Sequence, residues 1–94
     1  MKHGALMHTR EDDVAVVVED VSRGTSVGAV TLDGEKVTTV DAAEDIPLGH
    51  KIALREMAEG EDVVKYGRSI GRATQPIAAG AHVHTHNLKS KRWA

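Results

Sequence analysis

Three histidines at every second position are the residues of this chain best suited to chemistry: His82, His84 and His86. In a β-strand successive side chains point to opposite faces, so all three imidazoles would share one face, with neighbours roughly 6–7 Å apart. Imidazole is the commonest transition-metal ligand and titrates near neutral pH. The segment therefore predicts a strand whose histidines converge on a metal ion, a substrate oxygen or an anion. A solvated edge strand is the alternative that the same spacing allows.

The composition limits how large a core can surround these histidines. The chain has 94 residues, no Phe, one Tyr and one Trp. A chain of this length forms one domain and buries only about 60–65% of the surface that the unfolded chain exposes. We expect an aliphatic core with little room for a water-excluding active site, which favours a module that works with a partner over a complete enzyme.

Charge and cysteine content exclude several classes of protein. The net charge is −2 and the pI is near 6.3, which argues against a general nucleic-acid binder. The absence of Cys excludes disulfides, thiolate metal sites and cysteine nucleophiles. No apolar run approaches the ~20 residues that span a bilayer, and no signal-peptide core is present. We expect a soluble cytoplasmic protein.

Short runs rich in β-branched residues predict a mainly β fold. The predicted strands are residues 14–18, 28–32, 36–40, 51–54, 63–66 and the histidine segment. Asp33-Gly34 between two of these runs predicts a hairpin. The only helical pieces expected are short turns over residues 54–58 and 21–23.

One sequence frame recurs four times, as an apolar residue, two residues, Gly, two residues and a β-branched residue. The copies are residues 21–27, 46–52, 57–63 and 77–83. Glycine accepts a positive φ, so each copy predicts a turn that leads into a strand. The irregular spacing excludes a solenoid, and the frame instead predicts a folded-over β domain.

The ordered motifs of residues 46–54, 64–67, 70–71 and 80–87 resemble the SAF domain of the altronate/galactarate dehydratase family, and residues 13–16 are similar to its start. The resemblance implies a SAF-type β-clip, with residues 12–88 as the core of a single domain and residues 89–94 as a basic tail. In that family the domain begins a long hydro-lyase or forms a separate small subunit. Because this chain stops at Ala94, we expect the small subunit.

The end of the chain, residues 87–93, is similar to the small subunits of sulfolactate sulfo-lyases within this family. The resemblance implies a lyase subunit that β-eliminates sulfite or water from a small anionic hydroxy acid, active with a large catalytic subunit. An altronate- or galactarate-type dehydratase subunit is the alternative. The resemblance also implies a divalent metal, Fe2+, held mainly by the large subunit.

The resemblance assigns roles to individual residues. The expected catalytic residues are His84, His86 and His50, the first two also as metal ligands, and the expected substrate-binding residues are Asn87, Lys51, Lys65 and Tyr66. Packing roles for His50 and Tyr66 stay open, and His82 is expected to be peripheral.

The cations Lys89, Lys91 and Arg92 form either a solvated tail, a contact for an anionic substrate, or a segment that docks on the large subunit with Trp93 as its anchor. Arg and Trp are enriched at interface hot spots, so we expect docking.

Two other classes of function remain open. β-Clip domains also occur in non-catalytic settings, so a SAF-type binding module is possible on fold alone. A simple metal-binding protein is the other class, and it predicts tight metal uptake by the isolated chain.

Overall fold

The computed structural model describes residues 3–65 and 68–90, and over these residues the chain is all β. The strands are β1 (His3–Met7), β2 (Val14–Val17), β3 (Ser26–Thr31), β4 (Lys36–Asp41), β5 (Lys51–Ala53), β6 (Asp62–Lys65), β7 (Arg68–Ala73), β8 (His82–Val83) and β9 (Leu88–Ser90). The described part of the chain contains no helix long and apolar enough to cross a membrane.

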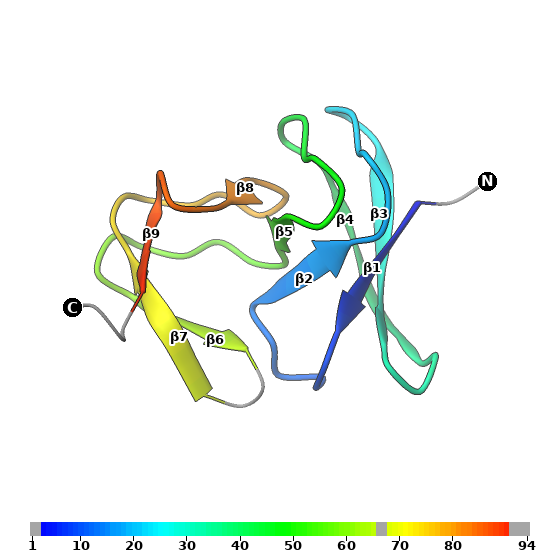
Figure 1. Ribbon diagram of the computed structural model, residues 1–94, viewed down its shortest axis with the longest axis horizontal. Helices are drawn as coiled ribbons and strands as arrows, with labels where there is room; N and C mark the ends of the chain where they lie inside the picture. Colours follow the sequence, from blue (N-terminus) through cyan, green and yellow to red (C-terminus); the bar gives the residue numbers. More distant parts are fainter. Residues whose placement is uncertain (1–2, 66–67, 91–94) are drawn as a thin grey trace.

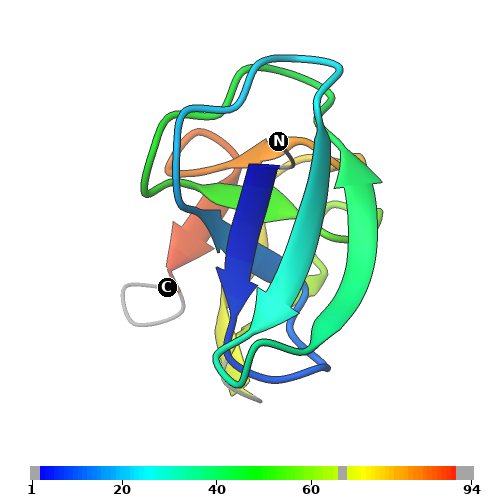
Figure 2. The ribbon, with the colours of Figure 1, turned by 90° about the vertical axis from the view of Figure 1, so that its right-hand side faces the viewer.

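The strands form two sheets. The larger sheet has the order β4-β3-β1-β2-β5-β8, and the smaller has the order β6-β7-β9. Figure 1 shows the smaller sheet at one end of the molecule and β1, β3 and β4 at the other, with β5 and β8 between them. In Figure 2, β1, β3 and β4 lie side by side. The β1–β3 pair is parallel and the other pairs are antiparallel.

The expected hairpin at Asp33-Gly34 is confirmed. It joins β3 and β4, whose antiparallel register runs from Ser26 opposite Asp41 to Val30 opposite Lys36. Gly34 has a φ of 90°, which suits a tight turn that no β-branched residue could form without strain.

The four copies of the repeated frame form the same turn. In every copy the residue after Gly donates its N–H to the carbonyl three residues earlier, as Thr25 does to Ser22 at 3.0 Å and Ala81 to Ala78 at 3.0 Å. The four frame glycines have φ between 85° and 88°, as a type II turn requires. The first residues pair across the molecule, Val21 with Ile46 and Met57 with Ile77. The expectation of similar turns launching strands is confirmed.

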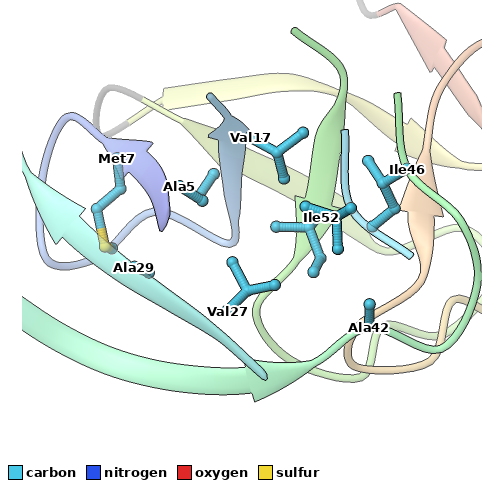
Figure 3. Packing of buried hydrophobic residues seen from close by; sticks show 10 residues of the cluster. Ala5, Met7, Val17, Val27, Ala29, Ala42, Ile46 and Ile52 are labelled. Atoms are coloured by element: carbon cyan, nitrogen blue, oxygen red, sulfur yellow. The ribbon is translucent and has the colours of Figure 1, made fainter. Parts of the chain in front are cut away.

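Two apolar clusters hold the sheets. One is shown in Figure 3 and includes Ala5, Val17, Val27, Ile46 and Ile52. The other joins residues of the smaller sheet to those of the larger; its members are Val14, Ala53, Met57, Val63, Ala73, Ile77, Ala81 and Val83. Strands β2 and β5 contribute to both clusters, so both of their faces are buried. A strand buried on both faces needs a continuous apolar run, which explains residues 14–17.

Asp13, just before β2, ties the larger sheet to β6. Its backbone N–H donates to Val64 O at 2.8 Å, and its carboxylate accepts the Val64 N–H at 2.8 Å. The same carboxylate binds Arg55 through Nε at 2.7 Å and Nη2 at 3.2 Å. Hydrogen bonds from Arg55 to Asp13 and then to Glu61 raise the pKa of Arg55. Asp13 is therefore a buried residue whose carboxylate accepts three hydrogen bonds.

The structure differs from the sequence expectations in three places. The helical turns expected over residues 54–58 and 21–23 are not helical. Residues 54–55 are a bend that precedes the third copy of the repeated frame, while Met57 and Val21 are bridge residues that begin copies of the frame. Strand β1 lies before the expected core of residues 12–88 and adds buried Ala5 and Met7 to it. Strand β9 includes Lys89, which was expected in the tail, while residues 91–94 lie outside the described part.

Candidate functional site

The histidine segment is a short strand followed by a turn, so the prediction of one strand through His86 is wrong. Strand β8 ends at Val83, and residues 84–87 turn back into β9. The side chain of Asn87 causes the turn: its Oδ1 accepts the His84 N–H at 2.9 Å, and its Nδ2 donates to His82 O at 2.8 Å. Asparagine favours turns because its side chain competes with neighbouring strands for backbone groups.

The turn nevertheless brings the imidazoles together with a fourth, which directly precedes β5. His50 lies between the frame glycine Gly49 and β5, and its ring centroid is 5.0 Å from that of His82 and 4.4 Å from that of His84. The His82 ring lies 5.6 Å from His84 and 5.2 Å from His86. We call His50, His82, His84 and His86 the histidine cluster.

His82 is the centre of the histidine cluster, and the expectation that it is peripheral is not met. Its Nε2 lies 2.8 Å from Nδ1 of His50, a hydrogen bond in which one of the two nitrogens carries the proton. Burial, followed by the charges of His50 and His86, lowers the pKa of His82, while Glu44 opposes this. The every-second spacing of the histidines predicts that His82 belongs to the cluster, whereas the family motif assigns it no role.

The backbone around His82 is fixed from two sides. Its N–H donates to the Glu44 carboxylate at 2.9 Å, and Ala43 N–H donates to Gly80 O at 2.8 Å. On the other side, β8 pairs with β5 so that His82 lies opposite Ile52. Half-buried His50 and His82 are thus held by the sheet, whereas His84 and His86 are exposed on the turn.

The lysines expected at the same cleft form a second group. Lys51 lies opposite Val83, one residue out of step with the His82–Ile52 pair, so it faces the other side of the sheet. Burial lowers the pKa of Lys65, the charge of Lys51 lowers it further, and Asp12 opposes both. Lys51 therefore lies across the sheet from the histidine cluster, close enough for its charge to act on Lys65.

Two other expected substrate contacts are placed as follows. Asn87 is buried, with 4% of its surface exposed, and the hydrogen bonds of its side-chain amide are made within the turn. It positions His84, and its expected contact with substrate stays a prediction. Tyr66 lies outside the described residues.

The donor set of the histidine cluster suits a transition metal. His50, His82 and His84 each offer one ring nitrogen, and these nitrogens all lie within 4.8 Å of one another. Neutral imidazole nitrogen favours Zn2+, Fe2+, Co2+ or Ni2+ over Mg2+ and Ca2+, which prefer oxygen. The group differs from the expected ligand pair because it contains His50 and His82 in place of His86.

Comparison with known proteins identifies relatives along nearly the whole chain. The (2R)-sulfolactate sulfo-lyase subunit alpha of Chromohalobacter salexigens is 43% identical over 89 residues, which cover 94% of this chain and 95% of that relative. The subunit alpha of the same name from Paracoccus pantotrophus is 50% identical over 52 residues, 55% of this chain and 78% of that relative.

A longer enzyme also contains this domain. The altronate dehydratase of Escherichia coli is 44% identical over 79 residues, which cover 84% of this chain but 15% of that protein. The profile of the altronate/galactarate dehydratase SAF domain matches residues 3–91. The resemblance expected from the sequence motifs is confirmed, and the chain belongs to the family of altronate/galactarate dehydratase SAF domains.

Proposed function

We propose that this chain is the small subunit of a lyase that eliminates sulfite from (2R)-sulfolactate in complex with a large catalytic subunit. The observation that carries the proposal is the match to 95% of a relative named (2R)-sulfolactate sulfo-lyase subunit alpha. A subunit designated alpha implies at least one other subunit. A cytoplasmic location for the complex is part of this proposal.

The reaction defines what the site must do. A base removes the proton from C2, the C3–S bond breaks, and its electron pair leaves with sulfite. The resulting enol becomes a keto acid. Such a reaction needs a base, an acid or Lewis acid near the leaving group, and cations that offset the negative charge of the substrate.

The residues of the chain can be matched to these needs. We assign the histidine cluster to one wall of the active site, with exposed His84 and His86 nearest the substrate and half-buried His50 behind them. A neutral imidazole there can accept the C2 proton. We assign Lys51 and Lys65 to an anion contact. Because Lys51 faces the side of the sheet opposite to His82, this contact requires the substrate or the large subunit to reach that side. Tyr66 and Asn87 keep their expected roles as substrate contacts.

A divalent metal, Fe2+, belongs to this proposal, and when bound it supplies a Lewis acid for the oxygen or sulfonate groups of the substrate. The nitrogen donors of the histidine cluster are compatible with that ion. In the expected arrangement the large subunit holds most of its ligands.

The second candidate function is a dehydratase of the altronate or galactarate type, in which water leaves in place of sulfite. The 44% identity over 79 residues to the Escherichia coli altronate dehydratase favours it. That enzyme contains a SAF domain within a much longer chain, whereas the sulfo-lyase relatives match along most of their own length.

Substrate comparison tests the proposal. The chain would be co-purified with the large lyase subunit of the same genome and supplied in turn with (2R)-sulfolactate, altronate and galactarate under anaerobic conditions with Fe2+. We expect sulfite and a keto acid from sulfolactate only. Keto acid from altronate or galactarate without sulfite would overturn the sulfo-lyase in favour of the dehydratase. Failure of all three substrates with a stable complex would favour a non-catalytic binding module.

A further inference from the structure

We propose that His50, His82 and His84 form a three-histidine site for a divalent transition-metal ion, in place of the arrangement expected from the resemblance, in which the large subunit holds most of the ligands. The ligand nitrogens come from two segments 32 residues apart that β5 and β8 bring together. The role of the ion in elimination rests on the proposed function, but its binding does not.

The distances match what a metal needs. A metal–imidazole bond is about 2.0–2.1 Å, so two such nitrogens at a right angle lie about 3.0 Å apart and in a tetrahedron about 3.4 Å. Nδ1 of His50 and Nε2 of His82 are 2.8 Å apart, and no two of the three ligand atoms are separated by more than 4.8 Å. The remaining gap would be closed by His84, whose side chain is exposed on the turn.

The hydrogen bond between two ligand nitrogens also permits binding. At the His50–His82 contact one of the two facing nitrogens carries the proton. If His50 moves its proton to Nε2, both facing nitrogens become acceptors without any net loss of protons. Both nitrogens would then be able to bind one metal ion.

The three ligands differ in exposure, and this difference leaves one side of the site open to solvent. His50 and His82 are half-buried and fixed by the sheet, whereas His84 is exposed. Three ligands with an exposed side leave coordination positions for substrate, as in catalytic rather than structural metal sites. Asn87, which bonds the backbone of both His82 and His84, sets the spacing of two ligands.

The proposed site differs from the ligand pair expected from the family resemblance, His84 and His86, because it does not include His86. Its ring contacts that of His82 at 5.2 Å, but it is not a member of the three-ligand group. It is therefore a neighbour of the three-ligand site and the natural control for it.

Cobalt titration of the untagged full chain tests the site. We expect one equivalent of Co2+ to bind, with a visible absorption band typical of nitrogen coordination. His50→Ala, His82→Ala and His84→Ala should each weaken binding at least about tenfold. His86→Ala and the exposed turn variant Thr85→Ala are the matched controls, and both should bind as the parent does.

The outcomes separate the site from the proposed function. No saturable Co2+ binding, or loss in His86→Ala with none in His50→Ala, would overturn the three-histidine site. Circular dichroism checks the fold of each variant, and His84→Ala keeps the test decisive because an exposed side chain can be removed without a cavity. Sulfite release without metal uptake by this chain would sink the site alone, whereas metal uptake without any lyase activity would sink the proposed function alone.

Discussion

A side chain at a glycine of this chain can be unfavourable for two reasons, a positive φ or a lack of space for Cβ, and three glycines allow the two to be told apart. Gly60 has a φ of 85° and open space where a Cβ would be. Gly71 has no such φ, but its Cβ would overlap the Lys89 carbonyl oxygen. Gly80 has both problems: a φ of 86° and an overlap with the Asp41 carbonyl oxygen. Substitution by Ala at each position therefore tests strain, close approach and their combination.

The magnitudes follow from these environments. A left-handed conformation costs a non-glycine residue about 1–2 kcal/mol, and we expect Gly60→Ala to lower the free energy of unfolding by about that amount. Overpacking costs about 1–3 kcal/mol, which is the expectation for Gly71→Ala. Gly80→Ala combines both, about 2–5 kcal/mol. A domain of this size has a total stability of only about 5–14 kcal/mol, so Gly80→Ala consumes much of it.

Urea unfolding followed by far-UV circular dichroism measures the three losses. The reasoning requires Gly80→Ala to lose clearly more than Gly60→Ala, because the two share their φ and differ in space. Equal losses would refute the close approach of residue 80 to residue 41 that holds the start of the histidine segment. If Gly80→Ala does not fold, the losses of Gly60→Ala and Gly71→Ala relative to the parent still test the cost of the positive φ and the cost of the close approach separately.

Two further predictions concern charged groups. Asp13→Ala removes a buried acceptor of Arg55 and Val64 and should lower the free energy of unfolding in urea by about 2–4 kcal/mol. Arg10→Ala breaks an ion pair that is exposed on both sides and should lower it by less than about 1 kcal/mol. Similar losses in the two variants would contradict the role of Asp13 in tying the larger sheet to β6. Because the pKa of Lys65 is lowered in the folded state, the unfolded chain binds more protons, so this residue makes stability rise with pH between its folded and ordinary pKa values. Lys65→Met should flatten that rise in unfolding curves measured across alkaline pH, and an unchanged slope would refute the lowered pKa.

Much of the fold could be predicted because local chemistry and tertiary structure agree. The Asp-Gly hairpin, the β-branched run of β2 and the four glycine turns each have a sequence signal that the structure confirms. Strand β1 could not be predicted in this way, since Ala, Leu and Met favour helices when packing does not decide. Its burial pattern, with Ala5 and Met7 inside and Leu6 exposed, is set by pairing with β2 and β3.

The candidate site was only partly predictable. The alternating histidines indicated a cluster, but the bonds from the Asn87 side chain to backbone groups of residues 82 and 84 end the strand early. The place of His50 beside His82 depends on the β5–β8 register, which no local pattern encodes. The separation of Lys51 from the histidine cluster has the same origin, because a shift of one residue changes the face on which a side chain lies.

The most direct test of the central claim, that the histidine cluster forms part of a lyase active site, is sulfite release by the complex of His84→Ala with the large subunit. His84 is exposed, and its ring lies 4.4 Å from that of His50. We predict a loss of at least about 100-fold in kcat with assembly intact, while Thr85→Ala in the same turn retains parental turnover. Unchanged turnover of His84→Ala in an intact complex would contradict the claim.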